Sequence, residues 1–336
     1  MKDVCYYKYF NQVQRSRIMK RIGVLTSGGD APGMNAAIRA VVRKCLYHNI
    51  QPYGISYGYS GLIEGEINKM NIGDVGDMIH KGGTILQTAR SEEFKTPEGQ
   101  KRALFQIYRH QLDALIVIGG DGSYCGAQAL IDQGVPIMGI PATIDNDITY
   151  TDVTIGFDTA LNTIVQSIDQ IRDTATSHGK ISLIEVMGRK SGALALRAGL
   201  AVGAESILIP ESSMSIEELI GRIKSGISRG KKHALIVVAE GAGSVVDLAK
   251  IINTEANLET RVTILGHTQR GGSPTAFDRV LASRLGGYSI ELLLNGIMNK
   301  AVGMRENRLI HYDFSQEDDN DLEIEELYSL SKEVSN

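Results

Sequence analysis

Two acids in one short polar run are the residues whose types and spacing are best suited to a chemical reaction. The run 141–147 (PATIDND) follows the apolar segment PIMGI and contains Thr143, Asp145 and Asp147. In open α/β sheets, ligands bind beyond the carboxyl ends of the strands. Turn chemistry explains one acid but not the whole run. The run is one sign of phosphoryl transfer, in which an Asp aimed at the acceptor hydroxyl can take its proton.

A further acid follows the preceding apolar segment. The segment ALIVIGG at 114–120 leads directly into Asp121, Gly122 and Ser123. Asp121 can hold Mg²⁺ directly or through water, and the small residues around it leave room for nucleotide phosphates. NAD kinases and lipid kinases share the GGDG pattern, and a strand-to-helix turn with an Asp near the helix start is the alternative. Two successive strands are thus expected to end in acid-bearing loops.

A glycine-rich segment at 26–35 (TSGGDAPGMN) follows the first apolar segment and opens a helical pattern. Glycines let the backbone approach a phosphate closely, and a helix N-terminus supplies unpaired N–H donors. The segment is neither GxGxxG nor GxxxxGK[ST], so a Rossmann cofactor site and a P-loop are both disfavoured. A turn that serves tight packing is the alternative.

Basic and polar residues follow the later apolar segments. Arg189 comes after the segment at 181–188, Glu240 ends the one at 234–241, and Arg261 precedes the one at 262–267. His267 and Arg270 lie three residues apart in a glycine-rich loop and can converge on one phosphate. Taken singly, each is more typical of a surface or capping residue. Their shared place at the carboxyl ends of strands favours a ligand.

Composition excludes several classes of function. The chain has 336 residues and a formal net charge of −4, which gives no electrostatic footprint for nucleic acid or a membrane surface. Its three cysteines, Cys5, Cys45 and Cys125, have no metal-binding spacing and predict reduced thiols in a cytoplasmic protein. Residues 1–18 have no signal-peptide pattern and predict an N-terminal extension, with Met19 as an alternative start.

Short apolar segments alternate with helical patterns along most of the chain. The segments are continuously apolar, as expected for parallel strands covered on both faces. Thr96 with Pro97, and Ser215 with Glu218, predict helix starts. The pattern predicts a doubly wound α/β fold with two mainly parallel sheets, and an acidic helix or tail at the C-terminus. The predicted strands lie at 21–27, 52–58, 114–120, 136–142, 181–188, 206–211, 234–241 and 262–267.

With these motifs assembled, the chain resembles the bacterial ATP-dependent 6-phosphofructokinases from about Met19 to about His311. The resemblance rests on LTSGGDAPGMNAAIR, IGGDGS, TIDND, GFDTAL, EVMGR and LGHTQRGGSP together. It implies that MgATP phosphorylates the 1-hydroxyl of fructose 6-phosphate in glycolysis, in a cleft between two domains. It also implies an ATP-binding domain at 19–156 plus about 269–319, and a sugar-phosphate domain at 157–268 plus about 320–336.

The resemblance assigns residues of this chain to roles. Asp145 matches the base, with Thr143 and Arg189 beside it, and Asp121 matches the Mg²⁺ ligand. The nucleotide site is matched by Gly29, Arg90, Ser91, Gly120, Asp121, Gly122 and Ser123. The sugar-phosphate site is matched by Thr143, Asp145, Lys180, Met187, Gly188, Arg189, Glu240, Arg261, His267 and Arg270.

Two small residues bear on the phosphoryl donor. Pyrophosphate-dependent relatives carry Asp where this chain has Gly122, and Lys where it has Ala142, so the resemblance implies ATP. ATP-using members commonly have Gly at the position of Ala142, and the extra methyl crowds the site if the backbone needs a positive φ.

Lys180 replaces an Arg that, in the family, reaches across subunits to the 6-phosphate. Lysine keeps the charge but loses the bidentate fork, which predicts weaker sugar-phosphate binding.

The resemblance further implies a homotetramer with active and effector sites between subunits. ADP and phosphoenolpyruvate are the implied effectors, and no nucleic acid or membrane partner is implied. Two other functions stay open at this point: a paralogous kinase for another sugar phosphate, and a non-catalytic regulatory subunit. The effector site is matched by Arg39, Arg43, Arg172, Gly203, Glu205, Arg229, Lys231 and His233.

Overall fold

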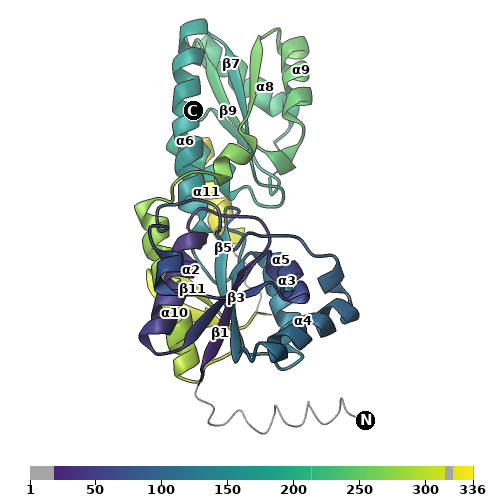
Figure 1. Cartoon of the computed structure of the whole chain (residues 1–336). Coiled ribbons are helices and arrows are strands. Elements are labelled where there is room, and N and C mark those ends of the chain that lie inside the picture. The colour runs from purple at the N-terminus through teal and green to yellow at the C-terminus, as the bar shows by residue number, and fades with distance from the viewer. Residues whose placement is uncertain (1–18, 213, 315–320, 336) are drawn as a thin grey trace. The chain divides into compact units, whose positions relative to one another are not determined.

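The computed structural model describes residues 19–212, 214–314 and 321–335, which form two compact units (Figure 1). Unit 1 comprises the described residues of Met1–Thr143, Tyr150–Gly156 and Ser273–Glu317. Unit 2 comprises those of Ile144–Thr149, Phe157–Gly272 and Asp318–Asn336. The predicted extension at 1–18, Cys5 and the acidic residues Glu317, Asp318 and Asp319 lie outside the described residues.

The units divide the chain differently from the predicted domains at two places. Ile144–Thr149 and residues 269–272 belong to unit 2, although the sequence assigned both segments to the first domain. Side chains explain the difference. Ser191 Oγ donates to the Asp145 carbonyl oxygen at 3.1 Å, and the Gln269 side chain accepts from Met187 N at 3.0 Å.

Unit 1 contains a mainly parallel sheet. Its described strands are β1 (Arg21–Thr26), β2 (Gln51–Ile55), β3 (Ile67–Lys69), β4 (Ala114–Gly119), β5 (Ile137–Thr143), β6 (Ile155–Gly156), β11 (Lys300–Arg305) and β12 (Arg308–Tyr312). The order is β12-β11-β5-β4-β1-β2-β3, with β6 paired to β5. Only the β2–β3 and β11–β12 pairs among these are antiparallel. The chain runs from β1 outward to β2 and later returns to β4, so the order reverses between β1 and β4.

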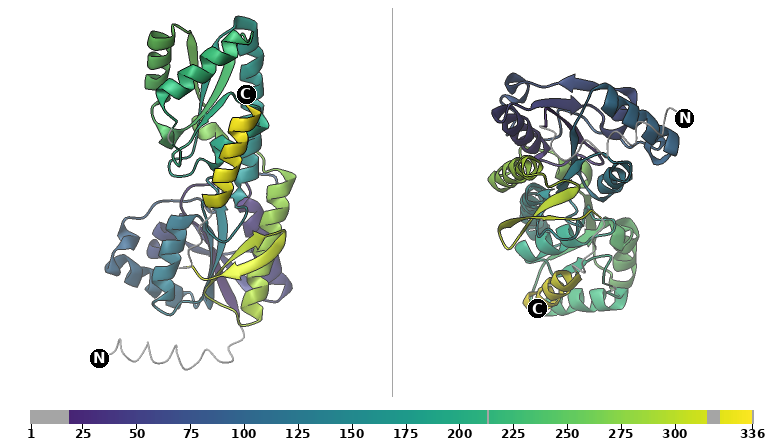
Figure 2. Two further views of the ribbon diagram at one scale, coloured as in Figure 1. Left: turned by 180° about the vertical axis from the view of Figure 1, so that it is seen from behind. Right: turned by 90° about the horizontal axis from the view of Figure 1, so that it is seen from below.

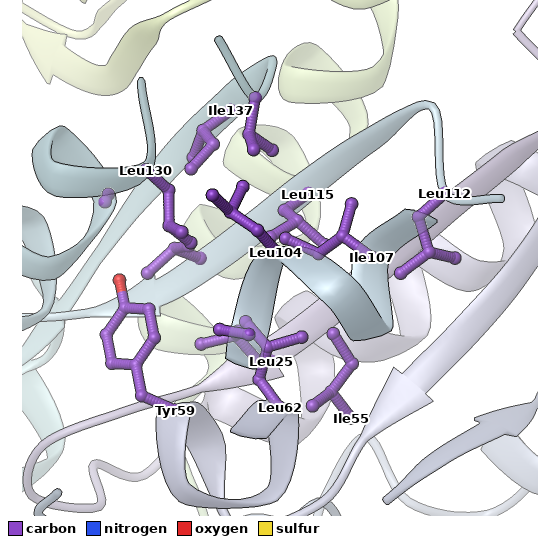
Figure 3. Close-up of a cluster of buried hydrophobic side chains, with 14 of the residues drawn as sticks. Leu25, Ile55, Tyr59, Leu62, Leu104, Ile107, Leu112, Leu115, Leu130 and Ile137 are labelled. Atoms are coloured by element: carbon purple, nitrogen blue, oxygen red, sulfur yellow. The ribbon is translucent and has the colours of Figure 1, made fainter. Parts of the chain in front are cut away.

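Helices cover both faces of this sheet (Figure 1). They are α2 (Met34–Tyr47), α3 (Gly58–Glu64), α4 (Pro97–Arg109), α5 (Asp121–Ile131) and α10 (Ala276–Leu294), with short 3₁₀ turns η1 (Ile72–Val75) and η2 (Glu93–Lys95). Figure 3 shows the core under α3, α4 and α5, where Leu62, Leu104 and Leu130 pack against Leu25 and Leu115 of the sheet. Burial of these leucines fixes the face that each helix presents to the strands.

Unit 2 contains a parallel sheet of β10 (Thr260–Ile264), β7 (Ile181–Val186), β9 (Ala234–Ala239) and β8 (Ser206–Leu208), in that order. Helices α8 and α9 supply Leu219, Ile223 and Ile252 to a core against Leu183 and Ile236. The helices of the unit are α6 (Phe157–His178), α7 (Ala193–Ala201), α8 (Ile216–Ser228), α9 (Val245–Ala256) and α11 (Asp321–Val334), with 3₁₀ turns η3 (Glu240–Ala242) and η4 (Gly266–Arg270).

Most predicted elements are confirmed. A strand lies in each of the eight predicted segments, and the doubly wound α/β class with mainly parallel sheets is correct. Thr96 and Ser215 cap α4 and α8 by accepting from Gly99 N and Glu218 N at 3.1 Å each. Of the cysteines, Cys45 is buried, which raises its pKa to about 12, and Cys125 is exposed. No helix in the described ranges is both long and apolar enough to span a bilayer.

The sequence analysis missed the hairpin β11–β12, which Figure 2 shows at the edge of the unit 1 sheet. Glu306 and Asn307 join the two strands with φ of 49° and 60°. Two consecutive residues with positive φ form the turn that suits a two-residue hairpin. Glu-Asn lacks the glycine that usually marks such a turn in sequence, so the hairpin gave no clear signal.

Candidate active site

The reversal of strand order in unit 1 brings two predicted phosphate loops together. β1 and β4 are paired in parallel, with Thr26 opposite Ile118. The glycine-rich loop after β1 and the segment Gly120–Ser123 after β4 therefore leave the same end of neighbouring strands. Ser27 N donates to the Ile118 carbonyl oxygen at 3.0 Å and continues the pairing past β1. A crevice at such a reversal is where open α/β sheets bind nucleotides.

The side chain of Ser123 packs close to the backbone at Gly28 and Gly119. A Cβ added at Gly28, where φ is +87°, would lie 3.3 Å from Ser123 Oγ, and one at Gly119 would lie 2.4 Å from it. Ser123 is 2% exposed, and its hydroxyl has no hydrogen-bond partner among the described residues. A buried hydroxyl without a partner is costly. A phosphate oxygen bound at this loop would satisfy it.

Asp121 and Gly122 open α5 at the same loop. Asp121 is exposed in the first turn of the helix, and a Cβ added at Gly122 would meet nothing within 4 Å. Within the described ranges, no three His, Cys, Asp or Glu side chains gather into a metal cage. Mg²⁺ commonly uses one or two carboxylates together with phosphates and water. The Asp121 carboxylate therefore fits Mg²⁺ that arrives with a nucleotide.

The other predicted nucleotide residues also lie in unit 1. Gly29 is half-buried in the loop after β1, and Arg90 is exposed in the segment before η2. Ser91 Oγ accepts from Phe94 N at 3.2 Å, which uses the hydroxyl to start the local turn. Ala142 lies in β5 opposite Ile155 and does not have a positive φ. The strain that the sequence analysis considered for Ala142 is thus absent.

Three adjacent strands of unit 2 end in the predicted sugar-phosphate residues. β7 pairs with β9 on one side and with β10 on the other. Arg189 follows β7, Glu240 follows β9, and His267 and Arg270 lie in η4 after β10. Arg189, Glu240 and His267 are exposed, while Arg270 is half-buried with an Nε that has no partner among the described residues. This end of the sheet presents cationic groups that an anionic ligand can contact.

Asp145 lies among these charged residues in unit 2 and is half-buried. Burial raises the pKa of its carboxyl, and the charge of Glu240 raises this pKa further. The cations Arg270 and Arg189 lower the pKa and thereby favour the carboxylate. The acid is thus more basic than an ordinary Asp, and its charge interacts with two arginines. Thr143, two residues earlier, ends β5 in unit 1 beside Gly120, where an added Cβ would lie 3.4 Å from Thr143 Cβ.

Gln269 is a positioning residue that the sequence analysis missed. It lies between His267 and Arg270 in the sequence, and its side chain is fully buried. Its Oε1 accepts from Met187 N at 3.0 Å, and its Nε2 donates to the Gly266 carbonyl oxygen at 2.8 Å. The amide thereby joins the loop after β7 to the loop after β10. The only sign of this role in the sequence was the place of Gln269 between two candidate ligand residues.

Glycines let the loops of unit 2 come close to one another. Gly188 has φ +137°, and an added Cβ there would lie 2.3 Å from the Ser191 carbonyl oxygen. A Cβ at Gly241 would lie 2.1 Å from the Arg189 carbonyl oxygen. Gly241 N also donates to the Gly188 carbonyl oxygen at 3.0 Å. The loops that carry Arg189 and Glu240 therefore need glycine at both positions.

Lys180 and Arg261 line one cavity of about 380 Å³ in unit 2, apart from the residues just described. Its wall also carries the side chains of Ser182 on β7 and Thr263 on β10. Two cations with nearby hydroxyls make a surface that suits an anion. The sequence predicted both cations as phosphate ligands, and the structure brings the two together.

The predicted effector residues fall in both units. Arg39 and Arg43 lie one turn apart on α2 in unit 1. In unit 2, Glu205 pairs with Lys231 at 3.2 Å, and both line a cavity of about 50 Å³ with His233. Three further predicted residues lie in unit 2. Arg172 on α6 bonds to the Val202 carbonyl oxygen, Gly203 follows α7, and Arg229 lies at the end of α8.

A sequence model of the family described as Phosphofructokinase matches residues 21–293. The chain belongs to the phosphofructokinase family. The resemblance inferred from the motifs is therefore confirmed. Among curated members, the ATP-dependent 6-phosphofructokinase of Halalkalibacterium halodurans is 59% identical over 318 residues, 94% of this chain and 100% of that protein. The protein of the same description from Bacillus subtilis is 58% identical over the same lengths.

Solved phosphofructokinases share this fold. The structure of phosphofructokinase from Saccharomyces cerevisiae is 36% identical with a TM-score of 0.82, over 93% of this chain and 46% of that chain. That of Pichia pastoris phosphofructokinase in the T-state is 33% identical with a TM-score of 0.86, over 94% and 37%. The chain thus spans less than half of each yeast polypeptide. A pyrophosphate-dependent member from Marinobacter aquaeolei, at 22% identity and a TM-score of 0.80, shows the fold alone.

The open space at Gly122 yields a prediction about nucleotide binding in this phosphofructokinase. We expect Gly122→Asp to weaken MgATP binding about 10-fold or more, because a second carboxylate beside Asp121 repels the triphosphate. Calorimetric titration with MgATP would measure it. Gly122→Asn is the matched control, since it adds similar volume without charge and should bind far more tightly than Gly122→Asp. Equal losses in the two variants would show that charge is not the cause.

Proposed function

We propose that this chain is an ATP-dependent 6-phosphofructokinase of glycolysis, which phosphorylates the 1-hydroxyl of fructose 6-phosphate. The observation that carries the proposal is the half-buried carboxylate of Asp145, whose charge interacts with Arg270, Glu240 and Arg189. The 59% identity to a curated ATP-dependent 6-phosphofructokinase over that protein's whole length supports it. The motifs that match the catalytic residues of such enzymes are intact, which disfavours a non-catalytic subunit.

Asp145 is the proposed base in this reaction. Its carboxylate takes the proton of the 1-hydroxyl while the sugar oxygen attacks the terminal phosphorus of ATP, and the bond from that phosphorus to the bridging oxygen breaks to release ADP. The raised pKa of Asp145 makes the carboxylate a stronger base. In a loose phosphoryl-transfer transition state the protein mainly positions groups and neutralises charge. Arg189 and Thr143 serve this purpose near the transferred group, while Arg270, His267 and the loop groups Met187, Gly188 and Glu240 bind the sugar phosphate.

Nucleotide binding is assigned to the loops of unit 1. The hydroxyl of Ser123 and the backbone at Gly29 and Gly120 bind the phosphates, with Arg90 and Ser91 on the nucleotide. Asp121 holds Mg²⁺, and the metal neutralises charge on the terminal phosphates when it is bound. Small residues at Gly122 and Ala142 leave room for the α-phosphate, which favours ATP over pyrophosphate. In this proposal unit 1 is the ATP-binding part and unit 2 the sugar-phosphate-binding part.

Assembly and regulation follow the family resemblance. We infer a homotetramer in the cytoplasm, in which Lys180 and Arg261 reach the 6-phosphate held by a neighbouring subunit. ADP and phosphoenolpyruvate are the proposed ligands of the effector residues. Two observations support an anionic ligand there: the Nε atoms of Arg43 and Arg172 are buried and have no partner among the described residues.

A coupled assay tests the proposal directly. Purified protein would be given ATP or pyrophosphate with a panel of sugar phosphates, with and without ADP and phosphoenolpyruvate. The proposal expects turnover with ATP and fructose 6-phosphate above all other pairs. Preference for another sugar phosphate would identify a paralogous kinase. Binding of both substrates without turnover would identify a regulatory subunit.

Removal of the proposed base should abolish most of the turnover. We expect Asp145→Asn to lower kcat about 10²- to 10⁴-fold, the usual contribution of a positioned general base. Steady-state kinetics would measure the loss, and circular dichroism would check the fold. Asp169→Asn removes an exposed acid from α6 and should leave kcat close to that of the wild type. An Asp145→Asn variant with nearly normal kcat would exclude Asp145 as the base.

The charge of Glu240 should set the pH at which activity falls. Asp145 acts as a base only when deprotonated, so kcat/KM decreases as the pH falls through its pKa. Because Glu240 raises this pKa, Glu240→Gln should lower it and move the acid limb to lower pH. The pH profile of kcat/KM for fructose 6-phosphate reports the free enzyme. Glu185→Gln, which removes another acid near Glu240, is the control. A limb that stays in place or moves to higher pH in Glu240→Gln contradicts the assignment.

Lys180 should bind the sugar phosphate more weakly than an arginine at the same position would. We expect Lys180→Arg to lower the KM for fructose 6-phosphate several-fold, because a guanidinium can bind phosphate through two donors. Initial-rate measurements on both proteins would test this. Lys250→Arg, on the exposed face of α9, is the matched control and should not change the KM. An unchanged or higher KM in Lys180→Arg would refute the idea that the lack of a two-donor guanidinium weakens binding.

A further inference from the structure

Glu259 is a charged neighbour of the proposed phosphate ligands that has no role in the function described above. Its carboxylate pairs with Lys180 Nζ. The side chain of Lys180 is 20% exposed and that of Glu259 is 69% exposed. Lys180 lines the cavity of about 380 Å³ together with Arg261. Glu259 lines the separate cavity of about 50 Å³, on the side of Glu205 and Lys231.

The sheet register imposes this pair. Ile181 N donates to the Glu259 carbonyl oxygen at 3.2 Å, and the next residues, Thr260 and Ile181, are opposite each other where β10 pairs with β7. Lys180 and Glu259 therefore enter neighbouring strands side by side. A substitution of the Glu259 side chain leaves this backbone bond in place. The backbone pairing of the two strands does not depend on the charge of Glu259.

We propose that Glu259 restrains Lys180 and thereby weakens binding of the sugar phosphate. Glu259 is a positioning residue in this scheme, and the proposal rests on the function proposed above. A phosphate beside Lys180 must compete with the Glu259 carboxylate for the same ammonium group. Glu259 does not line the cavity that Lys180 shares with Arg261. Its removal should therefore free the cation without removing a contact to the substrate.

Neutralising Glu259 should strengthen substrate binding. We expect Glu259→Gln to lower the KM for fructose 6-phosphate about 2- to 5-fold with kcat unchanged, which is the scale of a partly exposed ion pair. Calorimetric titration with fructose 6-phosphate should show the same change in Kd without turnover. Glu255→Gln removes an exposed acid from α9 and is the matched control, with no expected change.

A second background identifies the residue through which Glu259 acts. In Lys180→Gln, the further change Glu259→Gln should shift KM and Kd much less than it does in the wild-type background. An equal shift in both backgrounds would mean that Glu259 acts by general charge, and the proposal would be wrong. An unchanged or increased KM and Kd in Glu259→Gln would overturn it as well.

The same measurements separate this proposal from the proposed function. Wild-type protein that binds fructose 6-phosphate but does not phosphorylate it would refute the function, and the Kd values would still decide on Glu259. Wild-type protein that turns over fructose 6-phosphate but is indifferent to Glu259→Gln would refute only the restraint. Wild-type protein that neither binds nor phosphorylates fructose 6-phosphate would refute both.

Discussion

The balance of charge around Asp145 is the constraint on which the proposed sugar-phosphate site depends. Burial alone favours the neutral acid, which cannot accept a proton. Arg270 and Arg189 favour the carboxylate, and Glu240 opposes them. The carboxylate thus stays available while its basicity rises above that of an exposed Asp. The arrangement works only if the loops after β7, β9 and β10 hold these groups around one acid.

Those loops are held by packing rather than by the charged residues themselves. The parallel order β10-β7-β9 places three strand ends side by side. Gly188 and Gly241 allow two of the loops to touch through their backbones, and the buried amide of Gln269 ties the third to Met187. Since none of these residues carries charge, the electrostatics of the site depend on uncharged groups that hold the loops in place.

The sequence predicted those parts of the architecture in which a local pattern marks both a strand and the candidate site residues that follow it. Continuous apolar segments predicted the strands, and predicted ligand residues such as Asp121 and Arg189 follow one to three residues after them. What it missed depends on partners far along the chain. Gln269 bonds to Met187, 82 residues earlier, and Lys180 pairs with Glu259, 79 residues later. No spacing rule connects such residues, because only the sheet order brings them together.

Lys180 shows how a partner changes the meaning of a substitution. Considered alone, lysine in place of arginine loses the planar fork that grips a phosphate. In our proposal the pair with Glu259 adds a second cause of weaker binding, because the single ammonium is already engaged by a carboxylate. The first cause is the geometry of Lys180 itself, and the second is the charge of Glu259. A relative with arginine at this position and an acid at the position of Glu259 would keep only the second. The two proposed causes are therefore separable by substitutions at Lys180 and Glu259 that leave the residues around Asp145 unchanged.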